Sequence, residues 1–292
     1  MTIVQAVALF IAAIFAGALN SVAGGGSFIS FPMLLFTGVP AIQANATNAM
    51  AVWPGSMASI PPYRKDLAHE RRELIIFSAV SVIGGVLGAV ILLRTPPALF
   101  QRLVPWLLLV ATLIFAFGGT ITQWLRRRRA DAAAAQAGSQ AGSQAEAPIA
   151  SAPDDAANEA ANEAAGETHT TPRALAVVGV IQFVIAFYGG FFGGGMGIMM
   201  LAGFALLGMR NIHAMNALKV VLASIINGVA VIAFAIAGAI AWPQALVMVV
   251  GAIIGGYGGA ALAHRVPSQY VRWFAIAVGL LISAYFFIKQ GL

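Results

Sequence analysis

The sequence predicts an all-α polytopic membrane protein made of two inverted repeats of about five helical elements each, with glycine-broken or re-entrant helices near the membrane midplane. Hydrophobic residues make up 60% of the 292 residues and charged residues only 9%, which is more apolar surface than a soluble domain of this length needs. The two halves of the chain also match each other after a shift of 170 or 171 residues, and each half carries a glycine run inside an apolar segment. Matched, glycine-interrupted apolar segments indicate a secondary transporter.

The internal match extends over most of each half. A shift of 170 residues places Gly24-Gly25 on Gly194-Gly195, and a shift of 171 places Asn45-Ala46 on Asn216-Ala217. Further matched pairs are Gly38 with Gly208, Ile42 with Ile212, Gly84-Gly85 with Gly255-Gly256, Gly88 with Gly259, Arg94 with Arg265 and Pro96 with Pro267. Glycine is common in membrane helices in general, but scattered glycines would not keep this register.

Apolar segments define the expected elements in order. They cover 2–22, 27–39, 43–62, 74–93 and 98–125, and then 173–192, 196–208, 214–240, 243–263 and 270–288. The first segment has no Lys or Arg before it and runs into the glycine break, so we expect a retained span instead of a signal peptide. Segments 27–39 and 196–208 are shorter than the ~20 residues that a span needs, which predicts half-helices or re-entrant hairpins. Because five is odd, the second half should enter the membrane from the opposite side.

A polar tract separates the two halves, which gives three regions: a first membrane repeat at 1–125, a linker at 126–172 and a second membrane repeat at 173–292. Residues 130–171 hold seven acids and no Lys or Arg, among many Ala, Gln and Ser residues. Such a composition cannot bury enough apolar surface to fold, so we expect a disordered acidic linker. It acts as a spacer, or as a loose electrostatic clasp on the four arginines at 126–129.

Basic residues predict the orientation. The loop at 63–73 and the arginines at 126–129 belong in the cytoplasm by the positive-inside rule. Both termini are then expected outside, in a multi-pass protein of a bacterial inner membrane. The net charge of +6 is therefore a topology signal at the lipid bilayer, and no nucleic-acid partner is expected.

Missing residue types exclude several kinds of chemistry. The chain has no cysteine, and its four histidines lack metal-ligand spacing, so neither a metal nor a cofactor is expected. All ten acids lie in the 63–73 loop or in the linker, which excludes intramembrane aspartyl catalysis and disfavours a carboxylate-bound Na⁺ or proton site. Carbonyl-bound Na⁺ or an external proton route stays open. No Gly-x-x-x-x-Gly-Lys-[Ser/Thr] motif for ATP is present.

One base, Lys219, lies well inside an apolar segment. A bare ammonium in lipid is unfavourable, so Lys219 either faces a cavity and pairs with a bound anion or snorkels to the interface. Asn216 and Lys219 are spaced i, i+3 on one helix face, and Asn45 and Asn48 occupy the matched positions. The two polar pairs converge if the halves pack about a two-fold axis.

The glycine breaks supply the other part of the expected site. A helix that begins inside the membrane presents free N–H groups and a positive dipole end, which bind anions. Thr47 is a further possible donor, and the alternative for each polar residue is interhelical hydrogen bonding. The predicted substrate-binding residues are Asn20, Ser21, Gly24, Gly25, Gly26, Ser27, Asn45, Asn48, Gly194, Gly195, Gly197, Asn216 and Lys219.

These motifs resemble the sulfite exporter TauE/SafE family of membrane transporters. The matching residues run from Asn20 to Ser27, then Phe31-Pro32 and 44–48; in the second half they are 193–197, 213–217 and Lys219. The resemblance implies transport of a small, sulfur-containing anion such as sulfite or an organosulfonate, whereas the spacing alone indicates only a small anion. We therefore expect a secondary transporter that works by alternating access, and no enzyme activity. The alternatives are a passive anion channel and a non-transporting membrane subunit or intramembrane enzyme.

Overall fold

The computed structural model describes residues 1–22, 25–58, 60, 71–117, 172–207, 209, 212–262 and 268–291, and these form helices with no strand among them. The helices are α1 (Ile3–Val22), α2 (Ser27–Phe36), α3 (Ala41–Ala58), α5 (Arg71–Arg94), α8 (Pro172–Phe191), α9 (Met196–Leu207), α10 (Ile212–Ile236), α11 (Trp242–Leu262) and α12 (Ser268–Gln290). A further helix, Pro97–Phe117, follows α5. The all-helical fold class is thereby confirmed. The expected linker lies outside the described residues, apart from Pro172, where α8 begins.

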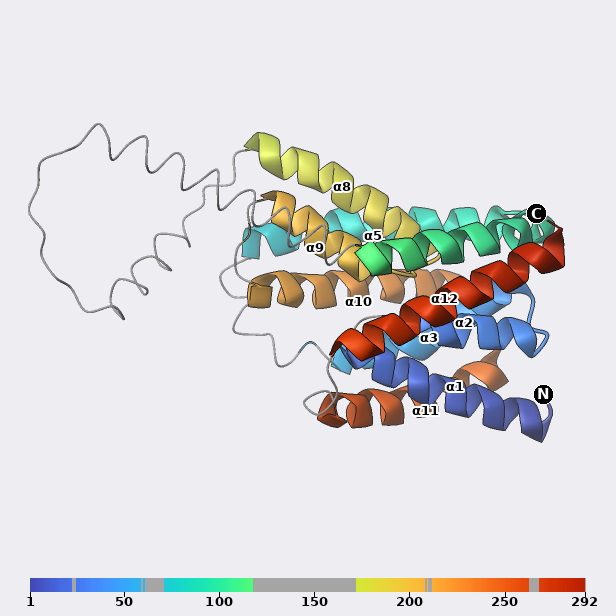
Figure 1. Ribbon diagram of the computed structural model, residues 1–292. Coiled ribbons are helices and arrows are strands. Elements are labelled where there is room, and N and C mark those ends of the chain that lie inside the picture. Colours follow the sequence, from blue (N-terminus) through green and yellow to red (C-terminus); the bar gives the residue numbers. More distant parts are fainter. Residues whose placement is uncertain are drawn as a thin grey trace, which may run out of the picture.

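Within the described ranges, four helices are long and apolar enough to cross a membrane: Ile3–Asn20, Arg72–Arg94, Pro97–Phe117 and Ala214–Ile236. Shorter apolar helices accompany them, and α2 and α9 are the two that follow the breaks. The beginning of α1 and the end of α12 lie at the same end of the bundle, whereas α5 begins at the opposite end (Figure 1). The chain is a multi-pass membrane protein.

The first helix of each half packs against a helix of the other half. The first helix of the first half, α1, packs along α11, and the matching first helix of the second half, α8, packs along α5. Glycines allow both close approaches, because a methyl group on Gly255 would clash with the carbonyl oxygen of Ile14 and one on Gly88 with that of Phe187. Small residues at such contacts are the usual way for membrane helices to pack tightly.

Two further contacts join elements that occupy the same place in each half. Helix α3 crosses α10, where the indole Nε1 of Trp53 donates a hydrogen bond of 3.0 Å to the Ser224 carbonyl oxygen. Helix Pro97–Phe117 contacts α12, where the rings of Trp106 and Phe287 pack edge to face at 4.9 Å. Trp53 and Ser224 are 171 residues apart (224 − 53 = 171), so they are equivalent positions of the sequence repeat.

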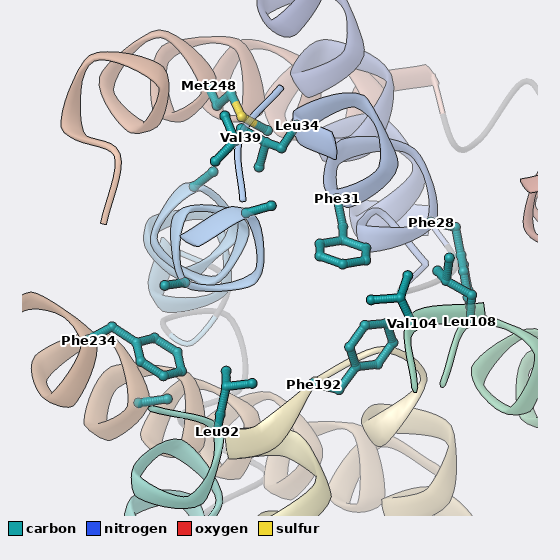
Figure 2. Close-up of a cluster of buried hydrophobic side chains, with 14 of the residues drawn as sticks. Phe28, Phe31, Leu34, Val39, Leu92, Val104, Leu108, Phe192, Phe234 and Met248 are labelled. Carbon is teal, nitrogen blue, oxygen red and sulfur yellow. The ribbon is translucent and has the colours of Figure 1, made fainter. Parts of the chain in front are cut away.

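A cluster of buried apolar side chains holds the broken segments in place. Phe31 of α2 and Phe192, which follows α8, point toward one another (Figure 2), with ring centroids 5.4 Å apart and planes at 89°. Leu92 of α5 lies beside Phe234 of α10 in the same cluster (Figure 2). The core therefore joins α2, which follows the first glycine break, to the second glycine break beside Phe192.

Candidate functional site

A cavity of about 240 Å³ lies between α3, α10 and the two glycine breaks. The first break lies between α1 and α2, and the second lies between α8 and α9. One water needs only ~10–15 Å³ on such a measure, so the cavity has room for a small ion together with several waters. Both halves of the chain contribute to its wall.

The walls from α3 and α10 share four pairs of equivalent positions. Helix α3 contributes Asn48, Ala49, Val52 and Ser56, and α10 contributes Lys219, Val220, Ala223 and Asn227. Each α10 residue follows its α3 counterpart by 171 positions (219 − 48, 220 − 49, 223 − 52 and 227 − 56). The spacing i, i+1, i+4 and i+8 keeps each set on one helix face. The cavity thus lies where the same face of the same element meets from both halves.

The breaks contribute equivalent positions as well. Ser27 and Phe28 line the cavity at the start of α2, and Gly197 and Ile198, 170 positions later, line it at the start of α9. The amide of Phe28 returns to the Gly25 carbonyl, and that of Ile198 to the Gly195 carbonyl, both at 3.1 Å. Ile29 and Met199 are bonded in the same way, to Gly26 and Gly195, so only the amides that precede Phe28 and Ile198 are left as donors at the two helix starts.

The second break depends on two glycines in the left-handed region. Gly193 has φ +82° and Gly195 has φ +77°, which side chains with a Cβ rarely adopt. Both glycines line the cavity, so the chain turns directly beside it.

Asn48 and Lys219 contact the break of their own half in different ways. Asn48 Nδ2 donates to Ser27 Oγ at 3.1 Å, and Ser30 Oγ donates to Asn48 Oδ1. The Lys219 stem instead passes over Gly197, where an added Cβ would lie 3.3 Å from Lys219 Cδ. Lys219 Nζ donates to Asn216 Oδ1 at 3.0 Å.

The charge of the cavity depends on one residue. Lys219 is the only ionisable side chain among the described lining residues, and the polar remainder consists of Asn20, Ser27, Asn45, Asn48, Ser56 and Asn227. Within the described part of the chain, the hydrogen-bond partner of the ammonium is the neutral Asn216 amide. An ammonium in an apolar setting requires a partner, and this environment offers it amide and hydroxyl groups only.

Most of the residues predicted from sequence line the cavity: Asn20, Ser27, Asn45, Asn48, Gly194, Gly195, Gly197 and Lys219. Asn216 stands behind them, bonded to Lys219. Asn45, which is 3% exposed, donates from Nδ2 to the Phe191 carbonyl at 3.1 Å and so ties α3 to the end of α8.

Other predicted residues lie elsewhere. Gly25 packs against the rings of Phe28 and Phe115, and a methyl group on Gly26 would clash with the Ala16 carbonyl; neither glycine is part of the cavity lining. Their lack of a side chain serves close packing of the break. Thr47 is buried and accepts a hydrogen bond of 3.0 Å from the Ala241 amide. Gly24 and the Ser21 side chain lie outside the described residues.

Sequence reasoning missed two polar lining residues, Ser56 and Asn227. Each lies eight positions after a predicted site residue, Asn48 and Lys219 respectively, and they are matched by the same shift of 171. The spacing of eight residues, together with the match between the halves, was the sequence signal that could have identified them. Three aromatic rings, those of Phe28, Phe192 and Phe234, complete the wall, and nothing in their sequence context separates them from other core residues.

Comparisons with known proteins identify a family. The family model described as Sulfite exporter TauE/SafE matches residues 9–286. The chain is 33% identical over 107 residues to the probable membrane transporter protein ORF9 of Sinorhizobium sp, covering 37% of this chain and 41% of that protein. It is 27% identical over 121 residues to a probable membrane transporter protein of Haemophilus influenzae, covering 41% of this chain and 48% of that one.

A further relative is the probable membrane transporter protein YfcA of Escherichia coli, which is 28% identical over 123 residues, 41% of this chain and 45% of YfcA. The chain therefore spans less than half the length of the curated relatives that it matches. No solved structure matches the chain.

Proposed function

We propose that this chain, which belongs to the sulfite exporter TauE/SafE family of membrane transporters, is a secondary carrier that moves a small anion by alternating access. The observation that carries the proposal is the composition of the cavity. One lysine, several neutral donors and no carboxylate among its described lining residues favour an anion, and a cation would find only carbonyl, amide and hydroxyl oxygens.

The ammonium of Lys219 would hold the anion by its charge, and neutral side-chain and backbone donors would add hydrogen bonds. An ammonium has three donors, and Asn216 uses one of those of Lys219, so two are left for a ligand. Asn48 on α3 and Ser27 on α2 line the same cavity, and the starts of α2 and α9 add backbone N–H groups. Charge-assisted hydrogen bonds of this kind are stronger than neutral ones.

An inverted repeat accounts for the symmetry of the contacts. Two equivalent residues can touch only close to the axis that relates them, so the Trp53–Ser224 contact supports a two-fold axis through the α3–α10 crossing. The exchanged packing of α1 on α11 and of α8 on α5 follows from the same axis. In the opposite-facing state we expect the halves to exchange conformations, with Asn216 binding the end of α1 as Asn45 now binds the end of α8.

The orientation proposed for the membrane follows the basic residues. We place the linker at 126–172 and the start of α5, with Arg71 and Arg72, on the cytoplasmic side of the cell membrane. The beginning of α1 and the end of α12, which lie at the other end of the bundle (Figure 1), are then outside. The membrane repeats are 1–125 and 173–292.

The family description names sulfite, and we infer a sulfur oxyanion or organosulfonate as the substrate. Flux into proteoliposomes should be measured for sulfite, sulfate, sulfonates and short carboxylates, with and without a pH gradient, and with protein-free liposomes as the control. The proposal expects saturable flux of at least one anion that is accelerated by the same anion on the opposite side. Flux that does not saturate and shows no such acceleration would indicate a channel, and flux no greater than in protein-free liposomes would refute transport of these anions.

A further inference from the structure

The two halves build the same contact with different side chains. Position 48 contacts position 27 through an amide–hydroxyl hydrogen bond. The equivalent position 219 contacts the equivalent position 197 through a lysine stem lying on a glycine. A neutral polar pair in one half thus replaces a cationic arrangement in the other, at otherwise equivalent places in the cavity wall.

This difference sets the net charge of the cavity. The starts of α2 and α9 bring roughly half a positive charge each, but the last turns of α1 and α8 reach the cavity too, through Asn20 and Gly190, with partial charges of the opposite sign. The four helix ends offset one another to a first approximation. What is left is the single charge of Lys219.

We propose that the site selects anions with one negative charge over dianions, and that the pair of positions 48 and 219 determines this valence. The inference rests on the proposed function, because it concerns the same cavity. A monoanion makes the loaded cavity neutral. A dianion leaves one charge uncompensated beside the rings of Phe28, Phe192 and Phe234, and an unpaired charge in such surroundings is strongly unfavourable.

Copying residues from one half into the other should change the charge of the anion that the site prefers. The double substitution Ser27→Gly with Asn48→Lys copies the second half's arrangement into the first half, with Asn45 in the place that Asn216 occupies behind Lys219. The reverse double substitution, Gly197→Ser with Lys219→Asn, copies the neutral pair into the second half. Both designs reuse side chains that the other half carries at the equivalent positions.

Three compounds of similar size and tetrahedral shape isolate charge from shape: dimethyl sulfone, methanesulfonate and sulfate, with charges of 0, −1 and −2. Their binding to the purified full-length protein should be measured by titration calorimetry in a buffer free of sulfonates. We expect the wild type to bind methanesulfonate about tenfold or more tightly than the other two compounds. The Ser27→Gly/Asn48→Lys protein should prefer sulfate, and the Gly197→Ser/Lys219→Asn protein should lose the preference for methanesulfonate over dimethyl sulfone.

Wild-type protein that binds sulfate as tightly as methanesulfonate would overturn the valence rule while leaving an anion site in place. Wild-type protein that binds neither of these anions nor sulfite would refute the proposed function, and the valence rule with it. A folded Ser27→Gly/Asn48→Lys protein that still prefers methanesulfonate would show that positions 48 and 219 do not determine the valence. The wild-type comparison tests the rule even if a variant fails to fold.

Discussion

The Lys219 stem lies on Gly197, so that a Cβ added to this glycine would sit 3.3 Å from Lys219 Cδ and 3.6 Å from Cγ. The glycine therefore belongs to the site through the position of another residue's charge. Gly197, at the start of α9, and Lys219 line the same cavity, and the contact keeps the two together.

Gly197→Ala should weaken anion binding by displacing the lysine stem. Because that stem is flexible, we expect a loss of about three- to tenfold in affinity, or roughly 0.6–1.4 kcal/mol, with little change in stability. Gly203→Ala on the same helix is the matched control, since its methyl group would meet Ile181 at an ordinary contact distance of 3.6 Å. Equal affinities for the two variants in a binding titration would contradict this role of Gly197.

Gly255→Ala should destabilise the protein, because the methyl group would clash with the Ile14 carbonyl and force α1 away from α11. Overpacking of this kind costs about 1–3 kcal/mol. Gly258→Ala on the same helix meets nothing within 4 Å and should be neutral or slightly stabilising, since alanine favours helix. Thermal unfolding in detergent compares the two; similar midpoints would show that α1 and α11 do not pack this closely.

Trp53→Phe should lower stability by at least about 1 kcal/mol, because it removes one hydrogen bond and part of the indole ring that packs against Gly228, and it should leave anion affinity nearly unchanged. The reason is that two equivalent positions beside the two-fold axis stay next to each other in both orientations of the carrier, so we expect the substitution to favour neither orientation strongly. Trp242→Phe is the control, because Trp242 is 47% exposed. Unfolding midpoints and binding constants check both parts, and a large change in affinity would argue against an axial position for Trp53.

Reporter fusions at residues 150 and 292 should show opposite sides of the membrane, with residue 150 inside. An odd number of elements in each half and the basic residues near 63–73 and 126–129 lead to this result. Both reporters on one side would be incompatible with the inverted repeat.

Apolar length and glycine position were enough to predict the helices, but their ends depend on local backbone geometry. The segment expected at 27–39 ends as α2 at Phe36, because Gly38 adopts φ +87°. Likewise α10 ends at Ile236, just before Gly238 with φ +64°. A left-handed glycine is a common helix stop, yet the sequence does not say which glycine adopts that conformation.

The site was partly predictable for a similar reason. The repeat drew attention to Asn48 and Lys219, and both line the cavity. It did not reveal which side of the first break faces the cavity, and so Gly25 and Gly26 were included although they pack against Phe115 and Ala16. Which face of a helix points to the cavity depends on how the helix is rotated about its axis when it packs. These helices are apolar on all sides, so their sequence does not determine that rotation.

The most direct test of the account is the equilibrium affinity of the purified protein for methanesulfonate, compared among the wild type, Lys219→Met and Lys219→Arg. Lys219→Met keeps the length of the side chain and removes the charge, so binding should weaken about tenfold or more, in line with ~1.5–3 kcal/mol for a charge-assisted hydrogen bond. Lys219→Arg should recover only part of the lost affinity, because a planar guanidinium group replaces a compact ammonium. A folded Lys219→Met protein that binds methanesulfonate as tightly as the wild type would contradict the central claim that this lysine holds the anion.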